Sequence, residues 1–580
     1  MQLSNSSAFS RRWSTALRLL KSGKFKEILI RTYRIIKRRK SKLRSIGYED
    51  WHEEWVEVSQ KDSDRITELI GSLAFQPFFS LIYIVSATEP SGGSQDLINS
   101  IREQIYPNWK LNVISPFAKG NDADDDDRIK YINNVEPSDL ELNEWISDLE
   151  LNDWVVPLES NTQLNKAALF SVASSIVERP ELSVIYSDHD HINHKGQLCD
   201  PYMKPSWNPD LFESINYLKP FIILNKNLWV EQIHSGEHLH DYLIQATRKI
   251  PANEILHLPQ ILASVYLGPL HCQIGNSSEH LLPKAIENKN AFPIKEPLVS
   301  LIIPTRDQGQ LLETCINSIY EKTTYENFEI ILVDHQSEEK QARRVIDSLE
   351  KKSNARIEKY SGDFNFSAMV NTGAEIAQGE IIVLLNNDTE IIEGNWLELL
   401  VTQVIRKEIG VCGALLLFKN RTIQHAGIHP SKNGLMIHGH KHEKENSFGY
   451  FGHLQTKHEV MAVTGACLST KKTTWNELGG FNANNLKVAY NDVDFCLKAR
   501  EAGLRILLEP KVKIIHHESA SRGVEQEVFR NHRLQKEISY MKDRWGEFLF
   551  HDPASSPNLL LTEEGIFLNS DPKEIPVWKR

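Results

Sequence analysis

Apolar runs that alternate with helical patterns constrain this 580-residue chain more than any other feature. In the second half, apolar runs at 297–305, 328–334 and 380–388 are separated by helical patterns such as 311–323 and 366–378. Continuous apolar strands joined through helices of this length predict a parallel sheet with both faces covered. Ligands of such α/β sheets bind beyond the carboxyl ends of the strands.

The first half repeats this order of elements, which indicates a duplicated unit. Residues 106–115 (YPNWKLNVIS) align without a gap on 325–334 (YENFEIILVD), and 240–246 (HDYLIQA) align on 491–497 (NDVDFCL). We therefore predict two tandem α/β modules with mostly parallel sheets. The predicted divisions are a basic helical extension at 1–77, a first module at 78–272, a polar linker at 273–297, a second module at 298–545 and a C-terminal tail at 546–580.

Composition places the chain among ordinary globular proteins, with 41% hydrophobic and 25% charged residues. No run approaches the roughly 20 apolar residues of a membrane-spanning helix, and the basic N-terminus lacks the apolar segment of a signal peptide. The six cysteines are scattered and form no CxxC pair. We expect reduced thiols and a cytoplasmic location.

Charge is concentrated at the N-terminus, where residues 1–48 hold 14 lysines and arginines and one acidic residue in a chain of net charge −11. Apolar residues such as Trp13, Leu17 and Ile28 alternate with these cations. One interpretation is a helix that lies on an anionic membrane surface. The other is a helix that packs on the acidic body of the protein. We expect no nucleic-acid partner, because no recognisable nucleic-acid module follows the basic segment.

Four polar residues of the second module stand where an α/β sheet collects ligand groups. Asp334 and Asp388 each close an apolar strand, and His516 ends a later one. Asp492 begins the helical pattern 491–504, with Asn491 at the expected N-cap. The four positions predict one site at the carboxyl edge of the sheet.

Each of these residues also has a simpler interpretation. A divalent cation takes oxygen ligands and often keeps one or two carboxylates together with substrate phosphates, so Asp388 and His516 suffice if a diphosphate supplies the rest. Asn386 and Asn387 can bind sugar hydroxyls, or they form a strand-end Asx turn. Asp492 is either a general base or a first-turn carboxylate that answers the helix dipole.

Several stretches of the second module are recognisable together and in order. The module resembles family-two inverting glycosyltransferases of the GT-A fold, in particular the bacterial branch that builds rhamnose-containing and related surface polysaccharides. The resemblance is carried by VSLIIPTRDQGQLLETCINSI, LLNNDTEII, IQHAGI, AVTGACLSTKK, LGGFN, NDVDFCLKAREAGLRILLEP and HHESASRG.

The resemblance implies a role for each candidate residue. Asp492 is the expected catalytic base, and Asp388 and His516 are the expected ligands of Mn²⁺ or Mg²⁺, with His517 the alternative to His516. The expected nucleotide-sugar-binding residues are Pro304, Thr305, Asp334, Asn386, Asn387, Asp388, Gly465 and Ala466.

The resemblance further implies an inverting transfer from a dTDP- or UDP-sugar to a glycan or lipid-linked acceptor, as in O-antigen or capsule synthesis. Such an enzyme is expected in the cytoplasm or peripherally on the inner membrane. Two alternatives are an inactive carbohydrate-binding or assembly protein and a nucleotidyltransferase. The second would need a further acidic metal cluster and basic phosphate contacts, of which the segment 304–310 offers only Arg306.

The first module lacks most of this chemistry. Its alignment places Ser115, Asn161 and Val265 opposite Asp334, Asp388 and His516, and only Asp241 keeps the carboxylate of Asp492. We expect a non-catalytic scaffold or acceptor-binding module. Two further features stay open. Asp188 and Asp190 are either an alternative metal pair or a solvated edge turn, and the histidine-rich segment 423–453 is a metal site or a solvated, acceptor-facing loop.

Overall fold

The computed structural model describes most of the chain. The described residues are 47–85, 93–115, 126–133, 153–235, 238–267, 296–431, 436–517, 527–550, 552, 554–562, 565–570, 572 and 574–580. The chain divides into two units, Met1–Glu57 and Val58–Arg580. In the first unit the described part forms α3 (Tyr48–Trp55). Residues 1–46 of the predicted membrane-contact segment lie outside the described residues.

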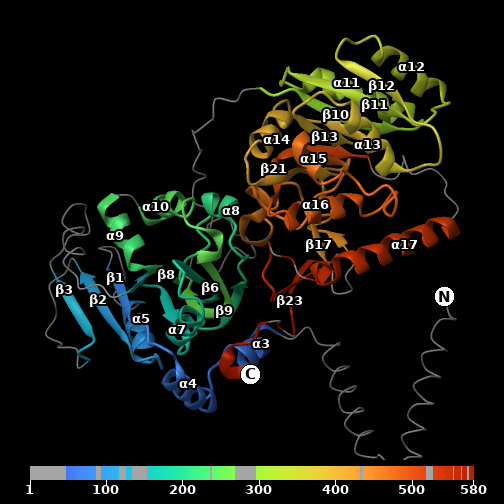
Figure 1. The fold of residues 1–580 in the computed structure, drawn as a ribbon. Coiled ribbons are helices and arrows are strands. Elements are labelled where there is room, and N and C mark those ends of the chain that lie inside the picture. The colour runs from blue at the N-terminus through green and yellow to red at the C-terminus, as the bar shows by residue number, and fades with distance from the viewer. Residues whose placement is uncertain are drawn as a thin grey trace, which may run out of the picture. The chain divides into compact units, whose positions relative to one another are not determined.

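The second unit contains two large sheets, blue to green and yellow to red in Figure 1. The first runs, in spatial order, β3 (Ile129–Asn133), β2 (Trp109–Ser115), β1 (Phe79–Ile84), β4 (Trp154–Leu158), β8 (Ile222–Asn225), β6 (Val184–Ile192), β9 (Ile255–Tyr266) and β5 (Thr162–Leu164). The second runs β12 (Ala355–Lys359), β11 (Phe328–Asp334), β10 (Val299–Thr305), β13 (Ile381–Leu385), β20 (Cys467–Lys471), β15 (Ile409–Leu417), β21 (Arg505–His516) and β14 (Thr389–Ile391). Strand by strand, the two orders correspond.

Helices cover both faces of each sheet. Those of the first module are α5 (Gly93–Arg102), α7 (Ala168–Glu178), α8 (Pro209–Ser214), α9 (Lys226–Ser235) and α10 (Leu239–Ala246). Those of the second are α11 (Gly309–Lys322), α12 (Lys340–Leu349), α13 (Phe366–Ile376), α14 (Trp396–Val404), α15 (Lys472–Glu477), α16 (Asn491–Glu501) and α17 (Glu527–Trp545). In β10, Ile302 and the adjacent Ile303 are both fully buried but belong to different cores. Burial on both faces explains why these strands are apolar without alternation.

The duplication extends to single hydrogen bonds. The Tyr106 hydroxyl donates to the Pro77 carbonyl over 2.7 Å, and the Tyr325 hydroxyl donates to the Pro297 carbonyl over the same distance. Parallel strands β1 and β2 start their pairing at Phe79 and Trp109, as β10 and β11 do at Val299 and Phe328. The predicted α/β class with tandem modules is therefore confirmed.

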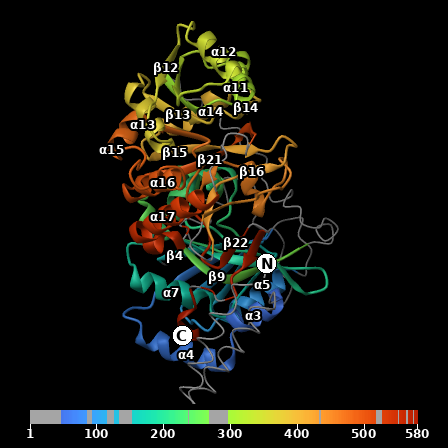
Figure 2. The same cartoon turned by 90° about the vertical axis from the view of Figure 1, so that its right-hand side faces the viewer.

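Segments outside the predicted first module pack into its core. Helix α4 (Gln60–Ser72) begins at a capping box of Ser59 and Asp62 and buries Ile66 in that core. From the C-terminal tail, Trp578 enters the same core. The tail hairpin of β22 (Leu559–Thr562) and β23 (Gly565–Leu568) lies near β9 in both views (Figures 1 and 2). There Asn558 donates a hydrogen bond to the Pro259 carbonyl.

The two modules are joined at a buried carboxylate. Asp210, in α8 of the first module, has a fully buried side chain. Arg406 of the second module contacts it at 2.5 Å, Lys457 contacts it at 3.3 Å, and Arg505 also pairs with it. Burial alone acts to raise the pKa of Asp210, but the charges of Arg505 and Arg406 outweigh it and hold this pKa below its ordinary value. The Asp210 contact therefore depends on all three cations.

The edge-turn interpretation of Asp188 and Asp190 is wrong. Both side chains are fully buried within β6, in the part that pairs with β9 and, on the other side, with β7 (Leu198–Tyr202). Asp188 accepts hydrogen bonds from the Lys204 backbone and the His257 ring, each over 2.7 Å. A strand that is buried on both faces forces such carboxylates to find internal partners.

The structure also bears on the cysteines and on membrane-spanning segments. Cys315, Cys412, Cys467 and Cys496 are buried free thiols. Among the same residues, no helix combines the length and apolar character that crossing a bilayer requires.

Candidate active site

The carboxyl edge of β10 and β11 brings the predicted nucleotide-binding residues together. Thr305 and Asp334 pair with each other at the ends of these parallel strands. The preceding residues, Pro304 and Val333, also pair with each other and are buried. The Asp334 carboxylate accepts two hydrogen bonds from Ser337, from the backbone over 3.1 Å and from the hydroxyl over 2.6 Å. Ser337 thus fixes the orientation of the Asp334 carboxylate at the mouth of the sheet.

The triplet Asn386–Asp388 follows β13 and turns into β14. The Thr389 hydroxyl donates to the Asn386 carbonyl over 2.8 Å. The buried Asn386 side-chain oxygen accepts no hydrogen bond from the described residues, so Asn386 does not form the alternative Asx turn. Asn387 is buried and donates to the Thr305 hydroxyl over 2.9 Å. Asn387 therefore holds Thr305 in place, and the Asn386 amide nitrogen, 3.4 Å from Nε2 of His516, links the triplet to that ring.

Asp388 and His516 face each other across β14 and β21. The Asp388 side chain is 1% exposed, and its Oδ1 lies 3.1 Å from Nε2 of His516. Gln424 determines the proton arrangement of that ring. Its amide nitrogen donates to the His516 carbonyl over 3.2 Å, which turns its oxygen toward His516 Nδ1 at 2.7 Å. Nδ1 therefore carries a hydrogen, and Nε2 is the nitrogen that faces Asp388.

This geometry suits a divalent cation. Nε2 lies 3.4 Å from the Asn386 amide nitrogen, which can donate to it, and 3.1 Å from the Asp388 Oδ1, whose lone pairs repel an unprotonated ring nitrogen unless a cation is bound between them. Metal-binding histidines commonly donate their other ring N–H to an oxygen, as His516 does to Gln424. Among the described residues no group of three or more His, Cys, Asp or Glu side chains converges on a metal position. The residues present therefore fit a metal whose remaining ligands come from a diphosphate.

His517 turns to another partner. Its ring lies 3.0 Å from the Glu390 carboxylate, and its backbone N–H donates to the Asp388 carbonyl over 2.9 Å. Because side chains alternate along a strand, His516 and His517 point to different sides of β21. The geometry thus brings His516, and not His517, next to the Asp388 carboxylate.

Asp492 connects to the triplet through the turn that precedes β20. Its Oδ2 accepts the Gly465 backbone N–H over 2.8 Å, and the carbonyl of the next residue, Ala466, accepts the Asn386 N–H over 3.1 Å. The predicted N-cap at Asn491 is wrong by one position. Asn491 is the first residue of α16, Tyr490 precedes it in a left-handed conformation, and the Asn491 amide donates to Ser367. Asp492 is partly exposed at the helix start.

Sequence reasoning did not single out Gln424 and His425 within the histidine-rich segment 423–453. His425 is fully buried, and this burial, with the nearby His438, holds the pKa of His425 well below its ordinary value. The neutral ring accepts the Thr464 N–H at Nε2 over 3.4 Å, so its Nδ1 donates toward His438 over 2.8 Å. Both residues belong to the motif IQHAGI, which could have marked them as functional. The motif could not reveal their partners, which are distant in sequence.

The first module repeats the scaffold of this site without its ligands. The Tyr266 N–H donates to the Asn161 carbonyl over 2.8 Å, as the His517 N–H does to the Asp388 carbonyl, and Thr162 pairs with Val265. The predicted correspondence of Val265 to His516 therefore holds, because Thr389 pairs with His516. Val265 cannot ligate a metal, and Asn161 is exposed.

The second module thus has the open α/β sheet, with carboxylate, imidazole and amide groups at its carboxyl edge, in which ligands bind outside the strand ends. Residues 300–469 match the family model described as "Glycosyl transferase family 2". The chain therefore contains a glycosyltransferase family 2 domain, as the sequence motifs predicted.

Two curated proteins resemble nearly the whole chain. "Uncharacterized protein y4gI" of Sinorhizobium fredii is 30% identical over 564 residues, which cover 89% of this chain and 61% of that protein. "O-antigen biosynthesis protein RfbC" of Myxococcus xanthus is 27% identical over 559 residues, covering 89% of this chain and 43% of that protein. The chain thus spans less than two thirds of either relative. The solved structure of GalNAc-T7 with UDP, GalNAc and Mn²⁺ aligns at a TM-score of 0.37 and 14% identity, over 43% of this chain and 50% of that chain.

Proposed function

We propose that the second module transfers a sugar, with inversion, from a dTDP- or UDP-linked donor to a glycan or lipid-linked acceptor during synthesis of a surface polysaccharide of the O-antigen or capsule type. The observation that carries the proposal is the link between Asp388, facing His516, and Asp492 through the Gly465 turn. The family match at 300–469 and the similarity to an O-antigen biosynthesis protein support it.

The reaction is a single displacement. Asp492 accepts the proton of the acceptor hydroxyl, whose oxygen forms a bond to the anomeric carbon of the donor. The bond from that carbon to the diphosphate oxygen breaks, and the nucleoside diphosphate leaves from the opposite face. The transition state is oxocarbenium-like, as in hydrolysis of the same bond. A positioned general base contributes about 10²–10⁴-fold to the rate.

Asp388 and His516 would hold Mn²⁺ or Mg²⁺ in this site. When bound, the ion neutralises charge on the departing diphosphate. Thr305 and Asp334 bind the nucleoside beside the carboxyl ends of β10 and β11, where Ser337 and Asn387 hold them in place. The Asn386 amide oxygen accepts a hydrogen bond from a donor hydroxyl.

The first module is a non-catalytic scaffold that contributes to acceptor binding. Its Asp241 lies in the first turn of α10, like Asp492 in α16, but Asn161 and Val265 replace the two metal ligands. The protein acts in the cytoplasm, and residues 1–48 attach it to the inner membrane surface. Removing these residues is expected to shift the protein from the membrane fraction to the supernatant after flotation of cell extract.

The test is a panel of dTDP-, UDP- and GDP-sugars offered to the purified chain with Mn²⁺, with Mg²⁺ or with a chelator. We expect hydrolysis or transfer with one donor only when metal is present, and a loss of at least a hundredfold in the Asp388→Ala variant. If no donor is bound and Asp388→Ala changes nothing, the protein is instead an inactive carbohydrate-binding or assembly protein.

A further inference from the structure

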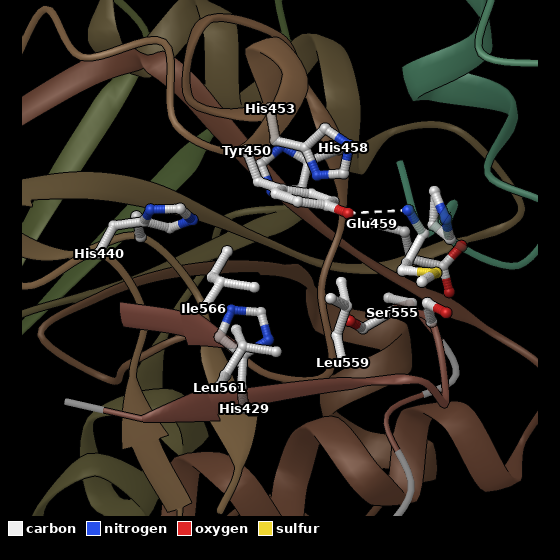
Figure 3. Close-up of a pocket in the computed structure, with 15 residues that line it drawn as sticks. His429, His440, Tyr450, His453, His458, Glu459, Ser555, Leu559, Leu561 and Ile566 are labelled. Atoms are coloured by element: carbon white, nitrogen blue, oxygen red, sulfur yellow. Dashed lines mark hydrogen bonds between the residues drawn. The ribbon is translucent and has the colours of Figure 1, made fainter. Parts of the chain in front are cut away.

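The histidine-rich segment 423–453 lines a small pocket together with the first module and the C-terminal tail. Figure 3 shows Tyr450 and His453 on one side of this pocket and His429 on the other. Its cavity of about 40 Å³ has room for a few water molecules and excludes a sugar ring. Among the described residues no cluster of metal ligands forms there. The expectation of a solvated loop is wrong for His425 and His429, which are buried.

The residue that precedes the candidate base has both ends of its amide in use. Asn491 Oδ1 accepts the Asp492 N–H over 2.8 Å, and Asn491 Nδ2 donates to the Ser367 hydroxyl over 2.9 Å. Asn491 is 3% exposed, and Ser367 is fully buried. The first turn of a helix leaves backbone N–H groups without partners inside the helix. Asn491 supplies such a partner to the backbone of Asp492.

Ser367 determines which way the Asn491 amide is turned. The Ser367 hydroxyl also forms a hydrogen bond with the Leu486 carbonyl. Because a carbonyl oxygen only accepts, this hydroxyl gives its hydrogen to Leu486 and accepts from Asn491. The amide nitrogen of Asn491 therefore faces Ser367, and the amide oxygen faces the Asp492 N–H. The opposite orientation of the amide would lose both hydrogen bonds.

The chain enters α16 through a strained residue. Tyr490 has φ 62° and ψ 4°, a left-handed conformation that a bulky side chain rarely adopts. Such a conformation persists only where the surrounding contacts hold it. On one side of Tyr490 its carbonyl accepts the Asp494 N–H over 2.8 Å, and the residue that follows is Asn491. The bond from Asn491 to Ser367 is thus one of the contacts that fix where α16 begins.

The support of Asn491 starts at the nucleotide edge. Ser367 lies in the first turn of α13, which Asn365 caps by accepting the Ala368 N–H over 3.0 Å. The segment that leads into this helix starts at Tyr360, whose N–H donates to the Asp334 carbonyl over 2.9 Å. A short stretch of chain, 360–367, therefore connects the candidate nucleotide ligand with the support of the candidate base.

The Asp492 carboxylate is oriented by two backbone donors. Oδ2 accepts the Gly465 N–H and Oδ1 accepts the Val493 N–H, each over 2.8 Å. These bonds aim the carboxylate only while the backbone of Asp492 stays in place. A general base has to lie within hydrogen-bond reach of the proton that it removes, and a misplacement of about 1 Å can cost about 100-fold in rate. A residue that fixes this backbone therefore affects the rate.

We propose that Asn491, oriented by Ser367, is a positioning residue of the general base. It holds the backbone of Asp492 at the start of α16, so that the carboxylate keeps its place on the Gly465 turn. The inference rests on the proposed function for the role of Asp492, and it assigns an effect on the rate to two buried residues.

Ser367 and Ser300 provide a matched pair for the test. Both are fully buried, and both hydroxyls donate one hydrogen bond and accept another. The Ser300 hydroxyl donates to Glu329 over 2.6 Å and accepts the Gly379 N–H over 2.8 Å, near the opposite, amino end of β10. Ser367→Ala removes the acceptor of Asn491, whereas Ser300→Ala removes an equally buried hydroxyl away from the carboxyl edge. Asn491→Ala is a second test variant.

Three measurements compare the full-length wild type with these variants. Thermal unfolding checks that each variant folds. Steady-state transfer kinetics separate kcat from the KM for the nucleotide sugar. Hydrogen–deuterium exchange, followed by mass spectrometry of a peptide that covers 463–467, reports on the Gly465 N–H that the Asp492 carboxylate accepts.

We expect Ser367→Ala and Asn491→Ala to lower kcat at least about tenfold with an unchanged KM for the nucleotide sugar, and to speed exchange in the peptide 463–467. Ser300→Ala should match wild type in both measurements. Wild-type exchange of this peptide in both folded test variants, a rise in KM alone, or the same loss of kcat in Ser300→Ala would each overturn the proposal. If wild type transfers no sugar, the proposed function fails, and the exchange measurement alone decides whether Asn491 positions Asp492.

Discussion

The two modules have the same order of strands in their sheets, but they differ in the residues at the strand ends. In the second module Asp388 is buried beside His516, whereas in the first the equivalent Asn161 is exposed and Val265 takes the place of His516. The shared order depends on apolar strands packed between helices, which do not involve these edge residues. Because ligand groups stand on strand ends and loops, a duplicated sheet can lose its chemistry without losing its fold.

Replacing the shared carboxylate in each module is the strongest test of this difference. We expect Asp492→Asn to lower kcat for sugar transfer by about 10²–10⁴-fold, because the acceptor loses its general base. Asp241→Asn should leave the rate unchanged. The two variants are compared in a transfer assay with the donor that wild type uses. Loss of transfer in a folded Asp241→Asn protein would show that the first module also takes part in catalysis.

The contact between the modules should be costly to break. Asp210→Ala leaves Arg406, Arg505 and Lys457 without their shared carboxylate, and removing one partner of a buried ion pair costs about 3–5 kcal/mol. Urea unfolding measures this loss. Arg248→Ala is the control. It removes an exposed pair with Glu213, which should contribute less than about 1 kcal/mol, and an equal loss in both variants would contradict the buried-pair interpretation.

The same contact predicts the effect of acid. The folded-state pKa of Asp210 is lowered, so its stabilising contribution is fully present above the pKa of about 3.9 expected for unfolded aspartate. The contribution is lost as pH falls below that value toward the folded-state pKa. The difference in unfolding free energy between wild type and Asp210→Ala should therefore be constant near neutral pH and shrink in acid.

Converting the second module toward the first should weaken nucleotide binding. Asp334→Ser copies Ser115 and removes the carboxylate that Ser337 orients. Hydrogen bonds to a charged group contribute about 1.5–3 kcal/mol, so affinity for UDP or dTDP should fall about 10–100-fold by calorimetry. The reverse change, Ser115→Asp, should leave the affinity at the wild-type value.

An effect of similar size, on metal affinity, is expected from the residue that orients the metal ligand. Gln424→Leu removes the acceptor for His516 Nδ1, and loss of such a partner costs about 10–100-fold in metal affinity. Mn²⁺ titration followed by electron paramagnetic resonance measures the change. His517→Leu should have little effect, since that ring pairs with Glu390. A larger loss with His517→Leu than with His516→Leu would reverse the assignment of the two histidines.

Much of the second module could be predicted from local patterns. The strand expected at 328–334 is β11 with the same bounds, and the helical pattern at 366–378 became α13 (Phe366–Ile376). The ends of these elements located Asp334, Asp388 and His516 on one edge. The prediction failed for Asp188 and Asp190, because polar residues within a strand resemble an exposed turn unless their burial is known.

The sequence by itself determined the α/β class, the duplication and the module that keeps the candidate catalytic residues, because these depend on short apolar periods and on residue identity at strand ends. Only the tertiary structure decided which histidine faces Asp388, and it showed that the tail and the first module line the same pocket. Gln424 lies 92 residues from His516, and Asp210 lies 295 residues from Arg505. Partners so distant are selected by the packing of whole sheets, which no local pattern records.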